Sequence, residues 1–216
     1  MSEPRRRGIA AVKPGEAPTR EDLFAAIGGV RGVVESVVPG FVFLLVFTAT
    51  GELLPSVVAP VGVAVIALLV RLIQRLPVLP AVSGGIGIAL SAGYALWTGR
   101  AEDNFVGGFI INSISLAVVL VSLAVRRPIV GVIASLINPE VDWKASRRAS
   151  RAVRVATMMW GAFFAFRLSV QVPLYFAGAT AALASTKLVM GLPLYAAMLW
   201  VTWLILRSVT SRPAAS

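Results

Sequence analysis

Six long apolar runs follow one another along the 216-residue chain, and they constrain its fold more than any other feature. A helix needs about 20 apolar residues, within a range of about 17–25, to cross a bilayer. Since 57% of the residues are apolar and only 14% are charged, the chain cannot cover itself with a polar surface. We therefore expect an all-α membrane protein, a bundle of about six transmembrane helices. The runs lie near residues 33–50, 57–73, 82–97, 105–125, 155–176 and 188–206.

The segments outside the runs are short and polar. Residues 1–18 contain Pro and basic residues without apolar periodicity, so we expect a disordered cytoplasmic tail there and a second tail at 208–216. Within residues 19–36, apolar side chains recur at helical spacing, which is typical of an amphipathic helix at a membrane surface. We interpret residues 19–207 as a single membrane domain that begins with this amphipathic helix.

The basic residues lie almost entirely in alternate connections between the runs. They precede the first run, lie between the second and third and between the fourth and fifth, and follow the sixth. The other connections, at 51–56, 98–104 and 177–187, contain only two basic residues. Because basic loops stay on the cytoplasmic side, this pattern predicts an inner (plasma) membrane protein with both termini in the cytoplasm. It also explains the net charge of +10 without a nucleic-acid partner.

The chain contains no Cys and no His. Disulfides, thiolate nucleophiles, imidazole bases and most zinc sites are therefore excluded. No Asp or Glu lies deep within a run, and the adjacent acids Glu102 and Asp103 fall in a loop, where we expect both to be solvated. We expect no catalytic, cofactor-binding or metal-binding residues, and a protein that is not an enzyme.

Arg167 lies near the middle of the fifth run, where burying an Arg costs about 2.5–3.5 kcal/mol on insertion scales. Gln171 lies one turn further on, while Asn112 and Ser115 belong to a polar stripe on the fourth run. One interpretation is a polar cleft of these four residues that binds an anionic group. The other is that Arg167 snorkels outward or pairs with a loop carboxylate and so holds helices together. The residues leave both open.

Small residues line two faces of the third run. Spaced at i, i+4, they let helices approach closely in lipid, so we expect this helix to lie centrally in the bundle. The two faces consist of Ser83, Gly87, Ser91 and Ala95, and of Ala81, Gly85, Ala89 and Gly93.

The longest cytoplasmic connection, residues 128–154, carries a basic cluster beside Trp143. Its first part, 128–137, is apolar but too short to span, so we expect it to lie along the interface. Basic residues beside a span attract anionic lipid by about 1 kcal/mol each, which predicts contacts with headgroups at the cytoplasmic face. The alternative is that these charges only fix the topology. The cluster consists of Lys144, Arg147, Arg148, Arg151 and Arg154.

Several motifs resemble those of a known family. The stretches GGVRGVVES, RRPIVG and FRLSVQVPLY are similar, in this order, to an actinobacterial family of multi-pass membrane proteins, domain of unknown function 3159. In layout the chain is more distantly similar to bacterial inner-membrane septation proteins, through Trp160 with Phe163 and Phe164. The family has no assigned activity, so the resemblance transfers no catalytic residue. It implies that Arg31, Glu35, Arg126, Arg127 and Arg167 lie in family-typical motifs.

Two functions follow as hypotheses. The first is a non-catalytic scaffold or assembly partner for cell-envelope or division machinery, bound to another membrane protein or to a second copy of the chain. The second is a small transporter or channel subunit with the polar cleft around Arg167. The absence of carboxylates deep in the runs and of an internal repeat favours the first.

Overall fold

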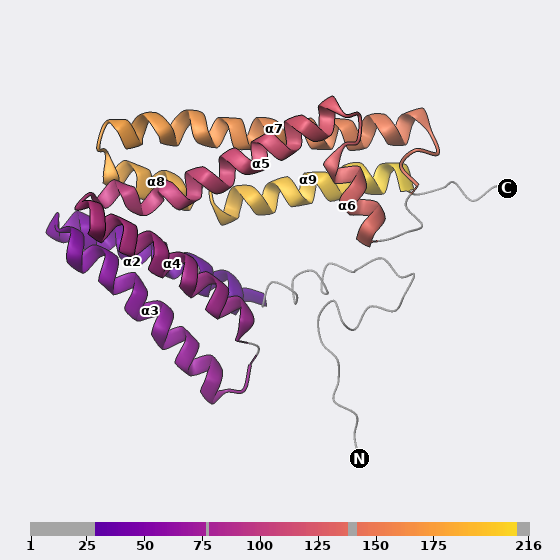
Figure 1. Cartoon of the computed structure of the whole chain (residues 1–216). Helices are drawn as coiled ribbons and strands as arrows, with labels where there is room; N and C mark the ends of the chain where they lie inside the picture. The colour runs from indigo at the N-terminus through magenta and orange to yellow at the C-terminus, as the bar shows by residue number, and fades with distance from the viewer. Residues whose placement is uncertain (1–28, 77, 138–141, 211–216) are drawn as a thin grey trace, which may run out of the picture. The chain divides into compact units, whose positions relative to one another are not determined.

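The computed structural model describes residues 29–76, 78–137 and 142–210 (Figure 1). The predicted tail 1–18, residues 19–28 of the predicted amphipathic helix and residues 211–216 lie outside the described residues. Within the described ranges the chain is helical and contains no strand. The elements are α2 (Gly29–Thr50), α3 (Leu53–Ile73), α4 (Leu79–Thr98), the 3-10 helix η2 (Ala101–Phe105), α5 (Val106–Ala124), α6 (Ile129–Ile137), α7 (Arg147–Phe176), α8 (Thr180–Val189) and α9 (Leu192–Thr210).

Five segments of the described chain are long and apolar enough to cross a membrane. This confirms the predicted all-α membrane bundle. The first apolar run is helical as α2, but its apolar part, Val37–Thr50, is shorter than these five, so a sixth crossing stays a prediction. The five segments are Leu53–Ile73, Ala81–Thr98, Ala101–Ala124, Arg147–Phe176 and Thr180–Arg207.

The helices extend beyond several of the predicted runs. The third run is part of a 20-residue helix, α4, and is therefore not short. The predicted loop 177–187 is wrong, because Thr180–Val189 forms α8 and belongs to a candidate span. Ala and Leu are strong helix formers, and they continue the helix past the polar residues at which the run seemed to end. The predicted tail 208–216 is likewise too long, since α9 continues to Thr210.

The chain forms two compact units. Of the described residues, the first unit contains 29–32, 115–164 and 196–210, and the second contains 33–114 and 165–195. Helices α2, α5, α7 and α9 therefore contribute to both units.

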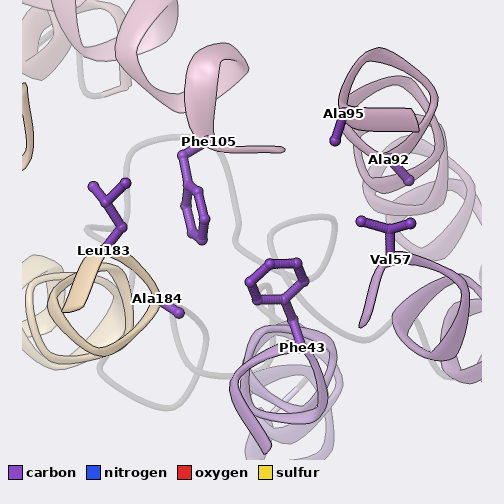
Figure 2. Close-up of a cluster of buried hydrophobic side chains, with 7 residues drawn as sticks. All are labelled: Phe43, Val57, Ala92, Ala95, Phe105, Leu183 and Ala184. Atoms are coloured by element: carbon purple, nitrogen blue, oxygen red, sulfur yellow. The ribbon is translucent and has the colours of Figure 1, made fainter. Parts of the chain in front are cut away.

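The core of the second unit is a cluster of seven buried side chains drawn from five elements (Figure 2). Phe43 of α2 and Phe105 of η2 point toward each other in Figure 2, and their rings meet edge to face with centroids 5.4 Å apart. Because lipid tails are as apolar as these side chains, close van der Waals packing holds the helices together. The cluster consists of Phe43, Val57, Ala92, Ala95, Phe105, Leu183 and Ala184.

Helix α4 does not lie centrally, contrary to expectation. Only 11% of its span is buried, against 39% for α7. Ala92 and Ala95, near its end, are buried, whereas Ser83 and Gly87 are exposed. The stripe is in contact only toward its end: a Cβ on Gly107 of α5 would lie 3.4 Å from Ser91 Oγ, whereas nothing lies within 4 Å of a Cβ added at Gly87.

The first unit is joined by contacts of α7 with its neighbours. The backbone N–H of Val130 in α6 donates a hydrogen bond to Thr157 Oγ1 at 3.3 Å, and the Trp160 indole N–H donates to Thr202 Oγ1 of α9 at 3.0 Å. The short helix α6 confirms that the apolar segment 128–137 does not span. The ring of Trp143 packs directly over Gly131 of α6.

Candidate functional site

Three polar side chains of the predicted cleft are buried in the second unit. Arg167 and Gln171 of α7 are 6% and 4% exposed, and Asn112 of α5 is 4% exposed. All three belong to candidate membrane spans. Arg167 therefore does not snorkel outward. Of the second interpretation of this residue, only the pairing with a loop carboxylate is left. Because burial of polar groups is costly without partners, their surroundings decide what they do.

Helices α5 and α7 place these side chains at one level. The rings of Phe109 and Tyr175 meet edge to face, with centroids 5.4 Å apart. Within this unit the two helices run in opposite directions (Figure 1). Asn112 lies one turn after Phe109 on α5, and Gln171 lies one turn before Tyr175 on α7. Because the helices are antiparallel, Asn112 and Gln171 are displaced in the same direction from the Phe109–Tyr175 contact and lie at a similar level. We call Asn112, Arg167 and Gln171 the polar cluster.

The hydrogen bonding of the polar cluster is incomplete. Asn112 Nδ2 donates to the carbonyl of Gly108 at 2.8 Å, but Asn112 Oδ1 has no partner among the described residues. Gln171 Nε2 is also buried and has no acceptor there. An unpaired buried polar atom costs about 1–3 kcal/mol, so these two atoms indicate a place where a polar partner belongs.

Arg167 lies against an aromatic ring. Its guanidinium carbon is 5.1 Å from the centre of the Tyr195 ring at the start of α9, which is a cation–π contact. Two loop carboxylates have other contacts: Glu102 pairs with Arg100 at 2.9 Å, and Asp103 accepts a hydrogen bond from Tyr175.

Sequence reasoning missed Lys187, which it placed in an outer loop. Lys187 lies on α8, within the candidate span Thr180–Arg207. Its Nζ is 4.9 Å from the centre of the buried Phe105 ring, which is a cation–π contact. The sequence did contain a clue that Lys187 lies in a helix: it follows the outer turn by about ten residues, in a segment rich in Ala and Leu.

The predicted cleft was to include a fourth residue, Ser115. It is partly exposed and lies one turn after Asn112 on α5, and its place in the cleft stays a prediction. The two hollows described below lie elsewhere.

Asp103 corrects a second expectation, because it is not solvated. It is only 3% exposed, and the hydroxyl of Tyr175 donates to its Oδ1 at 2.5 Å. The guanidinium of Arg100 lies over the Tyr175 ring at 5.5 Å, and the hydrogen bond and charge of Glu102 raise the pKa of Arg100. Across the described ranges, acidic residues do not gather in a group of three that could hold a metal ion. The expectation that the chain binds no metal stays a prediction.

The predicted basic cluster lines two hollows in the first unit. One has a volume of about 280 Å³ and is lined by basic side chains and the hydroxyls of Ser146 and Ser150. The other, also about 280 Å³, is lined by Arg147, Arg148 and Arg151. All five predicted basic residues therefore line one hollow or the other. The first hollow is lined by Lys144, Ser146, Arg147, Ser150, Arg151 and Arg154.

Local structure at the start of α7 positions these side chains. Ser146 Oγ accepts a hydrogen bond from the backbone N–H of Ala149 at 3.1 Å and so caps the helix. Ser150 Oγ donates to the Trp143 carbonyl at 3.1 Å, which ties the preceding turn to the helix. The ammonium of Lys144 lies 5.2 Å from the centre of the Trp143 ring. The cap therefore starts the helix so that three Arg side chains lie in its first two turns.

Comparison with known proteins yields one family. The family model "protein of unknown function (DUF3159)" matches residues 27–213, nearly the whole chain. The chain belongs to the DUF3159 family. No curated protein and no solved structure matches it.

Sequence reasoning also missed a partly buried ion pair between Arg71 and Glu35. Arg71, expected in a loop, lies in α3 and is 8% exposed. Its Nε donates to Glu35 Oε2 of α2 at 2.7 Å. Glu35 belongs to the motif GGVRGVVES, so one role of this DUF3159 motif is to join α2 to α3.

Proposed function

We propose that this DUF3159 protein is a non-catalytic, multi-pass protein of the inner (plasma) membrane that binds anionic lipid headgroups at its cytoplasmic face. It serves as a scaffold or assembly partner for cell-envelope or division machinery. The observation that carries the proposal is the pair of basic hollows at the start of α7.

The orientation follows from six crossings. Helix α2 has 22 residues, which at 1.5 Å per residue is about 33 Å and comparable to the hydrocarbon core. If α2 crosses together with the five longer segments, both termini lie on one side of the membrane. The distribution of Lys and Arg makes that side the cytoplasm, and residues 142–154 lie there too.

Electrostatics at the start of α7 favours an anionic ligand. The N-terminal end of a helix carries a partial positive charge, so cations in the first turn are unfavourable by about 0.3–1 kcal/mol each. Arg147, Arg148 and Arg151 lie in the first two turns and are exposed. A phosphate group in the hollow offsets both the helix dipole and the mutual repulsion of these side chains. Anionic headgroups of the cytoplasmic leaflet supply that group beside the interfacial ring of Trp143.

Lipid binding by the purified protein tests the proposal. Native mass spectrometry in neutral detergent would count bound short-chain phosphatidylglycerol and phosphatidylcholine. We expect phosphatidylglycerol to bind in preference. In the double variant Arg147→Gln/Arg151→Gln its affinity should fall by about 30-fold, at about 1 kcal/mol for each charge removed.

The double variant Arg126→Gln/Arg127→Gln is the matched control. It removes the same charge from two exposed residues that do not line either hollow. We expect its lipid binding to match that of the wild type. Equal losses in both variants, or equal binding of the two lipids by the wild type, would contradict headgroup recognition and leave only topology control.

The scaffold part of the proposal is supported by the headgroup surface, which would fix the protein to one leaflet. Its test is a strain lacking the protein. We expect altered envelope integrity or cell length, restored by the wild-type chain and by the variant Asp103→Asn. Stoichiometric divalent-metal binding that Asp103→Asn abolishes would contradict a non-catalytic role.

A small transporter or channel subunit is the second candidate function. The observation in its favour is the burial of Arg167, Gln171 and Asn112 inside candidate spans. Its test is uptake of anions by proteoliposomes, with Arg167→Leu and Arg167→Lys as variants. If Arg167 serves transport, both variants should insert normally, uptake should be lost with Leu and partly kept with Lys, which retains the charge.

A further inference from the structure

The second unit contains an interrupted helix at membrane depth. The candidate span Thr180–Arg207 consists of α8, which ends at Val189, and α9, which begins at Leu192 (Figure 1). The break lies about ten residues from the turn at 177–179, which is about 15 Å along the helix and near the middle of a bilayer. Irregular backbone is tolerated at such depth where it is buried in protein or lines a site, and interrupted helices in transporters bind ions there.

Arg167 lies at the level of this break. It precedes the end of α7 by nine residues, which is about 13 Å along the helix from the same turn. The contact of its guanidinium with the Tyr195 ring, in the first turn of α9, shows that the two helices meet there. The N-terminal end of α9, whose first N–H groups carry partial positive charge, therefore faces the same region as Arg167.

Positive charge is concentrated at this depth. Lys187, one turn before the break, has no carboxylate partner among the described residues, and its ammonium lies over the Phe105 ring. Arg167 lies near it along the chain path, because its guanidinium contacts Tyr195 one turn after the break. A cation inside a bilayer is costly unless it faces a partner or a cavity. An anion beside Lys187 offsets this cost.

The polar cluster adds one donor and one acceptor. Gln171 Nε2 is a buried donor without an acceptor, and Asn112 Oδ1 is a buried acceptor without a donor. Both side chains are 96% buried, because each is 4% exposed. A ligand that satisfies both must offer an oxygen acceptor and an O–H donor, in addition to its negative charge.

We propose that the second unit binds a small inorganic oxyanion that carries an O–H group, such as hydrogen phosphate or hydrogencarbonate, at the α8–α9 break. Arg167 and Lys187 supply the positive charge, Gln171 donates to an oxygen of the anion, and Asn112 accepts from its O–H. The site is separate from the headgroup surface of the first unit. It names the ligand class for the transporter alternative, but binding at the site does not require transport.

Equilibrium dialysis of the protein in neutral detergent tests the site, with radiolabelled inorganic phosphate as the probe and chloride as a competitor. We expect saturable binding of one phosphate per chain, and weak competition by chloride because chloride has no O–H. Gln171→Leu and Asn112→Leu should each weaken phosphate binding about 10- to 100-fold, the effect of a lost hydrogen bond to a charged group. Ser169→Ala, an exposed position on the same helix, is the control and should bind as the wild type does.

The variants keep the test decisive even if one of them folds poorly. Gln171→Glu is nearly isosteric and places a negative charge in the site, so it should abolish binding while circular dichroism shows an unchanged helix content. Arg167→Lys should retain weaker binding. Absence of saturable phosphate binding in the wild type overturns the proposal, as does binding that all four substitutions leave intact.

Two further measurements distinguish a free oxyanion from a lipid headgroup, and anion binding at this site from transport. Displacement of phosphate by short-chain phosphatidylglycerol would overturn a free oxyanion in favour of a lipid headgroup. Phosphate binding without uptake by proteoliposomes supports the site and contradicts transport, whereas loss of headgroup binding in the first unit leaves the site unaffected.

Discussion

At the scale of single residues, charged side chains in this protein are buried against partners far away in the sequence. Arg71 pairs with Glu35, 36 residues before it, and Asp103 accepts from Tyr175, 72 residues after it. Each pair joins two helices at an end of a candidate span. In an apolar environment such contacts are costly to break, because removing one partner leaves the other buried and unpaired.

Removing the Tyr175 hydroxyl should destabilise the second unit. The variant Tyr175→Phe leaves Asp103, which is 3% exposed, without its 2.5 Å hydrogen bond. We expect a loss of about 1–3 kcal/mol in the free energy of unfolding, measured by thermal unfolding in detergent. Tyr94→Phe, which removes an exposed hydroxyl, is the control. An unchanged melting temperature for Tyr175→Phe would show that the contact does not hold the helices.

Breaking the Glu35–Arg71 pair should cost more. Glu35→Gln leaves a buried guanidinium without its counter-charge, and we expect a loss of about 3 kcal/mol or more in the free energy of unfolding, measured in denaturant. The double variant Glu35→Gln/Arg71→Met should recover much of the loss, since it removes both charges. Glu52→Gln, at an exposed position, should have little effect. A double variant less stable than Glu35→Gln alone would contradict this account.

At the scale of elements, the apolar runs predicted most helices, and the errors lie at their ends. Length and hydropathy place α3, α4 and α5, and the short apolar segment before residue 138 is correctly a helix that does not span. The segment 177–187 was predicted as a loop because Thr180, Thr186 and Lys187 interrupt its apolar character. Hydropathy cannot show that η2 provides contacts for two of these side chains, as Glu102 does for Thr180 and Phe105 does for Lys187.

The α8–α9 break depends on a glycine. A Cβ on Gly191 would lie 2.6 Å from the backbone carbonyl oxygen of Lys187, closer than real Cβ atoms approach. We expect Gly191→Ala to shift the break and to lower the free energy of unfolding by about 1–3 kcal/mol, measured by thermal unfolding. Gly84→Ala, where nothing lies within 4 Å of the added carbon, should be neutral. Equal stability of the two variants would mean that the break tolerates a side chain.

At the scale of the whole molecule, the sequence predicted the class of protein, an all-α membrane bundle. Of the candidate anion site it named Arg167, Gln171 and Asn112, but neither Lys187 nor the α8–α9 break. Burial of Arg167, Gln171 and Asn112 agrees with one of the two interpretations of these polar residues, because such residues are tolerated only where they face protein or water. The contribution of Lys187 and the interruption at 190–191 could not be predicted, since both depend on which helices pack together. The basic cluster was expected from charge spacing, but the two hollows that it lines were not, since their shape depends on how Ser146 caps the start of α7.

The central claim is that the basic hollows face the cytoplasm of a multi-pass membrane protein. Because the chain has no Cys, a single introduced cysteine is a unique probe. The measurement is labelling of intact cells with a membrane-impermeant maleimide, using Lys144→Cys beside the first hollow and Glu52→Cys and Ala177→Cys in the opposite connections. We predict that Glu52→Cys and Ala177→Cys are labelled in intact cells and that Lys144→Cys is labelled only after lysis. Labelling of Lys144→Cys in intact cells would contradict the orientation and, with it, headgroup binding at the cytoplasmic face.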